Sequence, residues 1–476
     1  MAETTSSPSP VTPARALARR ATAFLAAGAM LLAQAPLPAH AQAAAKGLNV
    51  IRDAEIEELL RDYTRPILKA AGLAKQNIEV VIINDRAFNA FVADGRRIFV
   101  NLGALYEAAT PNQIIGVLAH ESGHIAGGHL ARMREQLATA QTAAIIAMLL
   151  AGAGVAAGAA TGRGNIAGEA APGLLLAPQE ILRRTLLSYA RSQEESADRA
   201  AVNFLNATQQ SARGMLETFQ RFADQGLFLS RQVDPYLMSH PMARERISQL
   251  ETIARQSPYF DRTDPPALQA RHDMMRAKLV GFVDRPEMVL RRYPSSNQSL
   301  PARYARAISA YRYSDTRNAI AQIEALIAEQ PNNPYFHELK GQALLESGKA
   351  RDAIAPLRRA AQISNGAPLI RMMLGQALVQ AGDPQFAEEA IRELLVALQR
   401  EPNASLGLRE LAVAYSRKGD QANAALAAAQ AAFNDGDFRT ARQLATRARA
   451  GFSQNTPGWL KSDDIVNFKP PKFGQN

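Results

Sequence analysis

Five consecutive residues in the first third of the chain, His120-Glu121-Ser122-Gly123-His124, have the types and spacing typical of zinc chemistry. Two histidines four residues apart lie on one face of a helix, so both rings can reach one metal ion. The glutamate beside the first histidine can hold a metal-bound water and accept its proton. The motif therefore predicts the zinc helix of a metalloprotease.

A catalytic zinc requires a third protein ligand, and the chain has no cysteine to supply it. Glu194 is the favoured ligand because it shares a helix face with Asp198, whose carboxylate can hydrogen-bond the free nitrogen of a ligand histidine. Glu195 is the alternative ligand, one position further along the same helix, but no acidic residue follows it four positions later. The extended metzincin motif would need a histidine where Leu130 stands. His129 points away from the two motif histidines if the helix is continuous.

The motif needs a packed helix and a second helix close to it. Thr110 and Pro111 are typical of an N-cap followed by a proline at the first helical position. Turn residues at Asn84-Asp85 and Asp94-Gly95 separate short apolar runs that favour strands. The pattern predicts helices over 51–73, 111–130, 181–205, 211–226 and 242–255, strands over 78–83 and 97–100, and a further strand within 87–92.

Beyond residue 300 the sequence repeats with a period of 34 residues. Pro334 and Pro368 are one period apart, and so are the Gly-Gln-Ala-Leu segments 341–344 and 375–378. This period, with small residues at helix crossings and a glycine at each turn between helices, resembles tetratricopeptide repeats. We expect a helical array over 301–455 that presents a concave surface to peptides or proteins. A merely structural helical tail is the alternative.

Length and charge limit the class of protein. A chain of 476 residues is too long for one ordinary core, so we expect two or three domains. The 54 basic residues exceed the 44 acidic ones by 10, but they form no long cluster and no stripe interleaved with aromatic residues. This distribution argues against nucleic-acid binding and is compatible with attraction to an anionic membrane surface.

The first 41 residues resemble a secretory signal peptide. Three arginines precede a short apolar run over 21–33, and Ala39-His40-Ala41 fits a cleavage site of small residues. The mature chain is then expected to begin near Gln42 and to reside in the periplasm. An uncleaved membrane anchor is the alternative.

A second apolar segment lies between the two expected metal-binding helices. Residues 136–162 carry no charge, and 143–160 are nearly all apolar, which meets the length criterion for a transmembrane helix. A single crossing would place His120 and Glu194 on opposite sides of the membrane, so the zinc site could not form. We therefore expect a loop beside the active site that touches the membrane or acts as a lid. A packed helix is an equal alternative.

Taken together, these motifs resemble one family of zinc peptidases. The segments His120–His124 (HESGH) and Glu194–Asp198 (EESAD), together with Ser239-His240-Pro241 and Arg246-Ile247, are similar to those of the HtpX-like gluzincins of peptidase family M forty-eight. Within that family, a signal peptide combined with C-terminal tetratricopeptide repeats resembles the BepA-like (YfgC-like) periplasmic protease-chaperones. The resemblance extends over nearly the whole mature chain.

The resemblance implies a zinc endopeptidase with one Zn²⁺ per chain. Its ligands would be His120, His124 and Glu194. Glu121 would be the general base, and Asp198 would hydrogen-bond a ligand histidine.

Further roles follow from the same resemblance. His240 could approach the zinc as a latch or as a transition-state donor, the alternative being a loop histidine that caps the next helix. Arg246 is a weaker candidate for electrostatic support of the reaction. Asn89, Ala90 and Phe91 would form the edge strand that binds substrate.

The expected fold is mostly α-helical: a gluzincin α+β metalloprotease domain with a small sheet, followed by an α-helical solenoid of tetratricopeptide repeats. The expected function is a protease-chaperone of the bacterial envelope that degrades unfolded or misassembled outer-membrane proteins or assists their assembly. The outer-membrane assembly machinery is then a partner of the repeats. The alternative is a repeat-based chaperone or assembly adaptor with a latched or inactive zinc site. The expected divisions are a signal peptide over 1–41, a protease domain over 42–260, a linker and connecting helix over 261–300, repeats over 301–455 and a C-terminal tail over 456–476.

Overall fold

The computed structural model describes residues 49–93, 95–136, 138, 190–228, 240–241 and 244–469. The expected signal peptide and the apolar segment 143–160 lie outside the described residues. Within the described part of the chain, no helix is long and apolar enough to cross a membrane.

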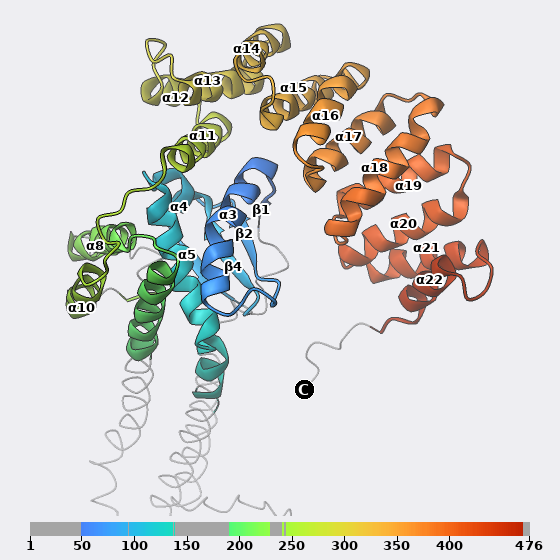
Figure 1. Cartoon of the computed structure of the whole chain (residues 1–476). Helices are drawn as coiled ribbons and strands as arrows, with labels where there is room; N and C mark the ends of the chain where they lie inside the picture. The colour runs from blue at the N-terminus through green and yellow to red at the C-terminus, as the bar shows by residue number, and fades with distance from the viewer. Residues whose placement is uncertain are drawn as a thin grey trace, which may run out of the picture. The chain divides into compact units, whose positions relative to one another are not determined.

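A small mixed sheet contacts α5, the helix that carries the motif His120–His124 (Figure 1). The strand order is β1-β2-β4-β3, with β2 and β4 parallel and the two outer strands antiparallel to their neighbours. β-branched and aromatic side chains favour these strands, and their buried faces join the core with α3 and α5. The strands are β1 (Val50–Ile51), β2 (Glu79–Ile83), β3 (Ala90–Val92) and β4 (Arg97–Asn101).

The helices around the sheet follow the predicted amphipathic segments with small shifts, except that residues 181–189 of the predicted helix 181–205 lie outside the described residues. Asp53 caps α3 by accepting a backbone N–H of the first turn, so the helix starts later than predicted, because Val50 and Ile51 pair with β2. Thr110 is the N-cap residue of α5 and Pro111 is its first residue, as predicted. The helices are α3 (Ala54–Ala70), α4 (Leu102–Glu107), α5 (Pro111–Ala126), the helix over 190–207, α8 (Arg213–Phe228) and α10 (Arg244–Arg255).

The prediction of a continuous helix over 111–130 was wrong. α5 ends at Ala126, and Gly127 and Gly128 form a turn before a second helical stretch begins at His129. Gly128 has a φ of +62°, a backbone conformation that residues with a Cβ rarely adopt. The two glycines therefore stop the helix directly after the motif.

The repeated glycines have the two roles that their period predicted. A Cβ on Gly341 of α15 or on Gly375 of α17 would lie 2.4 Å or 2.5 Å from a leucine of the following helix, so both glycines permit a close helix crossing. Gly348 and Gly382 have φ values of +77° and +76° in the turns between helices. The helices of this part are α11 (Pro266–Val283), α12 (Pro286–Arg292), α13 (Leu300–Tyr313), α14 (Thr316–Glu329), α15 (Pro334–Glu346), α16 (Ala350–Ile363), α17 (Pro368–Gln380), α18 (Ala387–Arg400), α19 (Ser405–Arg417), α20 (Gln421–Asn434), α21 (Phe438–Ala450) and α22 (Pro457–Asn467), with a 3₁₀ turn at Pro384–Phe386.

The fold is mostly α-helical with one small sheet among the described residues, as the sequence predicted. Helices occupy much of the segment expected to be a linker and connecting helix, and part of the expected C-terminal tail. α11 and α12 lie within 261–300, and α22 lies within 456–476. Because α11 packs on α13 and α22 packs on α21, helical packing continues on both sides of the repeats.

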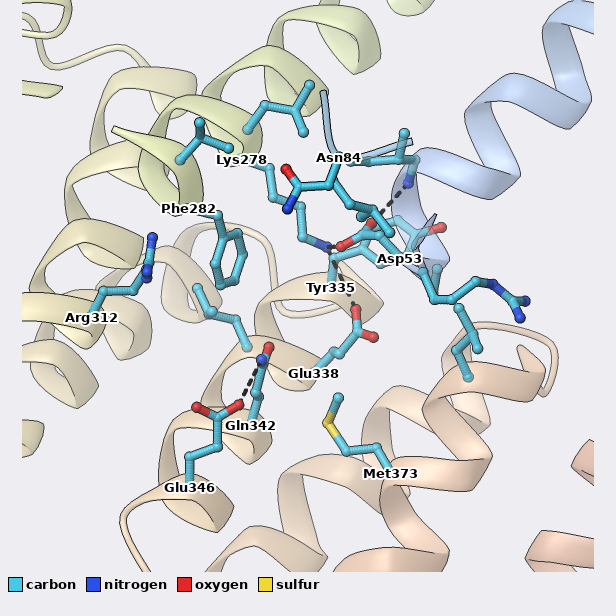
Figure 2. A pocket seen from close by; sticks show the side chains of 18 of the residues that line it. Asp53, Asn84, Lys278, Phe282, Arg312, Tyr335, Glu338, Gln342, Glu346 and Met373 are labelled. Carbon is cyan, nitrogen blue, oxygen red and sulfur yellow. Dashed lines mark hydrogen bonds and ion pairs between the residues drawn. The ribbon is translucent and has the colours of Figure 1, made fainter. Parts of the chain in front are cut away.

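A buried ion cluster joins the start of α3 to α11, α13 and α15. Nζ of Lys278, a residue only 5% exposed, lies 2.7 Å from Asp53 Oδ2, 3.3 Å from Glu55 Oε2 and 3.8 Å from Glu338 Oε2. The hydroxyl of Tyr304 donates to Glu55 Oε2 at 2.9 Å. We call these five residues the Lys278 cluster. Figure 2 shows the Lys278 side chain between Asp53 and Glu338, at the wall of a cavity of about 930 Å³.

Candidate metal centre

Three segments bring the predicted metal-binding residues together. α5 carries the motif residues, the helix over 190–207 carries Glu194 and Asp198, and His240 and Arg246 lie just before and within α10. All of these side chains are buried except that of His124, which is slightly exposed. Residues far apart in the sequence therefore form one compact polar site inside an apolar core.

A glycine of the motif sets the distance between the two metal-binding helices. A Cβ on Gly123 would lie 2.8 Å from the carbonyl oxygen of Ala197 and 3.1 Å from its Cα. Ala197 directly precedes Asp198 on the second helix. Only a glycine lets the two backbones touch at this point, and this contact brings the polar side chains of both helices within reach of each other.

One ligand atom from each of His120, His124, Glu194 and His240 lies within 4.8 Å of the other three. The Nε2 atoms of His120 and His124 are 3.1 Å apart, and each lies 3.3 Å from an oxygen of Glu194. Ligand atoms around a tetrahedral zinc at 2.0–2.1 Å are separated by about 3.3 Å. Two imidazoles and one carboxylate are thus spaced as a zinc ion requires.

Glu121 supports the same interpretation. Both of its carboxylate oxygens are buried, and no described residue donates a hydrogen bond to them. His240 Nε2 lies 3.4 Å from Oε1 of this carboxylate. Burial raises the pKa of this carboxyl group. A buried acid without a donor is costly unless a ligand or a water satisfies it, so this group is suited to hold a metal-bound water.

Asp198 lies beside the outer nitrogen of His120, and Arg246 in turn binds Asp198. Asp198 Oδ1 lies 2.9 Å from His120 Nδ1, the ring nitrogen that faces away from the ligand atoms. Arg246 donates to both oxygens of Asp198, from Nε at 2.7 Å and from Nη2 at 2.8 Å. Burial would raise the pKa of Asp198, but the arginine holds it below its usual value. An ionised Asp198 is thereby positioned to orient the His120 ring.

His240 lies directly against the predicted ligands. Its Nδ1 is 3.1 Å from Glu194 Oε2 and 3.3 Å from His120 Nε2. Its Nε2 is 3.2 Å from the carbonyl oxygen of Ala90. The ring therefore spans from the metal-binding atoms to the edge strand of the sheet.

The charge states of the buried groups favour a bound cation. Burial lowers the pKa of His124 to about 3, so this imidazole is neutral. Burial would raise the pKa of Glu194, but His240, His120 and His124 hold it well below its ordinary value. Burial would lower the pKa of His120, yet Asp198 and Glu194 raise it to about 9. A neutral imidazole and an ionised carboxylate are the forms that bind zinc, and at His120 a bound cation would replace a proton.

The predicted edge strand contributes to the site through one of its three residues. Ala90 directs its carbonyl oxygen at His240, while the carbonyl oxygen of Asn89 accepts the backbone N–H of Asn101 within the sheet. Phe91 stacks on Phe99 with ring centroids 5.2 Å apart. β3 is the last strand in the order, so no other described strand pairs with its outer edge.

Sequence reasoning missed Phe219 of α8. Its ring packs edge-on against His120 with centroids 5.3 Å apart, and the Arg246 guanidinium lies 5.4 Å from its centre. The ring therefore packs against a predicted ligand and its support at the same time. Nothing in the sequence distinguishes it from the other apolar residues of an amphipathic helix, so no local signal could have found it.

Comparisons with known proteins identify the families that parts of this chain match. Residues 51–254 match Peptidase family M48, and residues 304–368 and 344–411 match two tetratricopeptide-repeat families. A protein from Yersinia pestis named Beta-barrel assembly-enhancing protease is 25% identical over 423 residues, which cover 83% of this chain and 83% of that protein. A protein of the same name from Escherichia coli (strain K12) is 25% identical over 351 residues, covering 71% of this chain and 68% of that protein.

Among solved structures, one titled MamA MSR-1 C2 covers 35% of this chain and 93% of its own, with 21% identity. Its TM-score of 0.30 is too low to establish a shared fold.

The site and the comparisons define the class of protein as a metalloprotease. The chain combines a peptidase family M48 domain with tetratricopeptide repeats, and it is similar over most of its length to the beta-barrel assembly-enhancing proteases.

Proposed function

We propose that the chain is a zinc endopeptidase of the bacterial envelope that acts on unfolded or misassembled outer-membrane proteins. The observation that supports it most is the convergence of His120, His124 and Glu194 beside the buried carboxylate of Glu121. This donor set has the composition of a catalytic zinc site with three protein ligands and an open position.

The proposed chemistry is peptide hydrolysis. His120, His124 and Glu194 would hold a zinc ion, which would supply an acidified water and polarisation of the scissile carbonyl. Glu121 would accept a proton from the attacking water and later pass it to the leaving amine. Asp198 keeps the His120 ring oriented, and the outer edge of β3 pairs with the substrate backbone as an added strand.

The repeats would hold the client or an assembly partner. Tetratricopeptide helices normally bind peptides or proteins, and holding a client near the cleft raises its effective concentration there. The relatives are named for beta-barrel assembly, which supports outer-membrane proteins as clients and the outer-membrane assembly machinery as a partner. The predicted signal peptide supports residence in the periplasm, and the apolar segment 143–160 supports peripheral contact with a membrane.

A second function, a chaperone or assembly adaptor whose zinc site is latched, is favoured by one observation. His240 lies among the ligand atoms and also against Glu121 and Ala90, where water and substrate would have to bind. A site closed in this way would bind clients through the repeats without cleaving them.

One experiment distinguishes the two functions. Zinc content and cleavage of casein and of an unfolded porin are measured for the wild type and for Glu121→Gln and His240→Ala. Glu121→Gln should retain zinc and lose about 100- to 10,000-fold in cleavage, since it removes only the base. Faster cleavage by His240→Ala supports a latch, and loss of cleavage supports a donor.

The ligand register has its own control. Glu194→Gln should lose zinc, whereas Glu195→Gln should keep it, because Glu195 is not among the clustered ligand atoms. Wild-type cleavage by Glu121→Gln would refute the proposed mechanism.

A further inference from the structure

The turn after the motif folds one more histidine back onto the metal centre. The N–H of Gly127 donates to the carbonyl of Gly123 at 2.9 Å, and that of Gly128 donates to the carbonyl of Ile125 at 2.9 Å. A Cβ on Gly127 would lie 2.3 Å from the ring of His129, so the ring occupies the space that any other side chain would fill. The glycine pair is thus shaped to place His129 against the end of α5.

The ring of His129 contacts the second predicted ligand. His129 Nδ1 lies 3.0 Å from His124 Nδ1, and the two rings meet edge to face with centroids 5.0 Å apart. His129 is only 4% exposed. The contact uses the nitrogen of His124 opposite to Nε2, and Nε2 is the atom that lies beside His120 and Glu194.

A second contact fixes His129 to the other metal-binding helix. Gln193 is buried, and its side-chain amide donates to the backbone carbonyl of His129 at 3.2 Å. Gln193 directly precedes Glu194. The backbone of His129 is therefore tied to the helix of the third predicted ligand, while its ring contacts the second.

We infer that His129 is a positioning residue that accepts the Nδ1–H of His124 and thereby leaves His124 Nε2 free to bind the metal. This inference rests on the proposed zinc site. His129 contacts Nδ1 of His124, just as Asp198 contacts Nδ1 of His120. A ligand histidine whose other nitrogen donates a hydrogen bond keeps one tautomer and one ring orientation, and loss of such a partner typically weakens metal binding by about 10- to 100-fold.

His129 is not itself a ligand in this arrangement. It is absent from the group of described residues whose ligand atoms converge. Its nearest approach is to the outer nitrogen of His124, so the His124 ring separates it from the ligand atoms.

Two variants separate hydrogen bonding from packing. His129→Asn keeps an acceptor oxygen near the place of Nδ1, whereas His129→Leu fills similar space without an acceptor. Zinc dissociation constants are measured by competition with a chelating dye, in the Glu121→Gln background, which should be inactive in proteolysis. Absorption spectra of the Co²⁺-substituted proteins report the ligand geometry independently.

We expect His129→Leu to bind zinc about 10- to 100-fold more weakly and to shift the Co²⁺ spectrum, while His129→Asn stays within about threefold of the parent. His337→Ala removes a half-buried histidine that hydrogen-bonds the Pro331 carbonyl, outside the metal centre; it is the matched control and should change neither readout.

Equal zinc affinity in the parent and in both His129 variants would overturn this inference and leave the proposed function intact. Equally weak binding by the Asn and Leu variants would also overturn it, because packing alone would then explain the loss. A wild-type protein that binds no zinc would overturn the proposed function and this inference with it.

Discussion

Arg246 shows how closely the individual side chains of the metal centre depend on each other. It donates to both oxygens of Asp198, and its Nη1 lies 2.8 Å from Glu194 Oε2. The side chain is buried, and its guanidinium lies over Phe219. Two buried carboxylates therefore share one cation, which offsets part of the cost of burying their charges.

The first prediction concerns this arginine. Arg246→Met keeps the apolar stem but removes the charge, so it should lower the free energy of unfolding by about 3–5 kcal/mol, because it leaves unpaired buried carboxylates. Urea unfolding of the metal-free protein measures the loss. Arg255→Met on the same helix is the control, since Arg255 is exposed, pairs with Glu251 and lies over Phe260, and its loss should cost less than about 1 kcal/mol. Equal losses of unfolding free energy in Arg246→Met and Arg255→Met would contradict the role assigned to Arg246.

At the scale of the elements, the contact between α5 and the helix over 190–207 determines whether a site can form. The two backbones meet at Gly123 and Ala197, one residue before Asp198. Helices packed through ordinary side chains keep their axes 8–10 Å apart, and a glycine at the crossing reduces that distance.

The second prediction tests this contact. Gly123→Ala should force the helices apart, lower the free energy of unfolding by about 1–3 kcal/mol and weaken zinc binding, since the new methyl group would lie 2.8 Å from a carbonyl oxygen. Thermal unfolding and dye competition measure the two effects. Ser122→Ala, which removes only a hydroxyl bonded to the Leu118 carbonyl within the helix, should leave zinc binding unchanged. Unaltered zinc binding by Gly123→Ala would show that the contact is not needed.

The sequence predicted the helices well where an amphipathic pattern continues over several turns. It predicted them poorly where one or two residues determine the start or the end of an element. The amphipathic runs predicted α8 and α10 within about two residues, because several turns of buried side chains define them. β1 was missed because Val50 and Ile51 are strand only through their pairing with β2. The adjacent glycines 127 and 128 were a visible break signal, and reading the helix through them gave His129 the wrong direction.

The residues of the candidate site also differ in how far the sequence could predict them. The motif spacing is local, so it predicted that His120 and His124 share a face. The Glu-x-x-x-Asp spacing predicted Glu194 from a second helix, which required an assumption about tertiary contact. No spacing rule could bring Phe219 or the carbonyl of Ala90 to the same place, because only the packed core does so.

At the scale of the whole molecule, the Lys278 cluster links the start of the protease region to the helices of the repeats (Figure 2). Asp53 and Glu55 come from the start of α3, while Lys278, Tyr304 and Glu338 come from α11, α13 and α15. Three acids surround one lysine, so they cannot all be ionised at low cost. Burial raises the pKa of Glu338 and that of Glu55.

The third prediction concerns pH. A carboxyl group whose pKa is raised by folding binds a proton more readily in the folded state, so its contribution to stability is complete below its ordinary pKa of 4.5 and is lost as pH rises through the folded pKa. Glu338→Gln removes the titrating carboxyl group, so the variant should not lose this part of its stability as pH rises. The free energy of unfolding of the metal-free variant should fall less than that of the wild type between about pH 5 and about pH 8.

The matched control is Glu324→Gln. Glu324 is exposed and pairs with Lys340 at the surface, so this change should leave the slope with pH as in the wild type. Parallel pH profiles for Glu338→Gln and the wild type would show that Glu338 does not carry the raised pKa.

The carbonyl oxygen of Ala90 has a consequence for catalytic regulation. It points to the outer edge of β3, where an incoming peptide N–H would bind, and His240 already occupies it. If the outer edge of β3 binds substrate as proposed, substrate and His240 would compete for this acceptor, and peptide binding would be thermodynamically linked to release of the histidine. A segment able to adopt an extended conformation would then gain the hydrogen bonds that displace the ring. Folded proteins would be spared because their backbones are already paired, and a chain would be open to cleavage only while it remains unfolded.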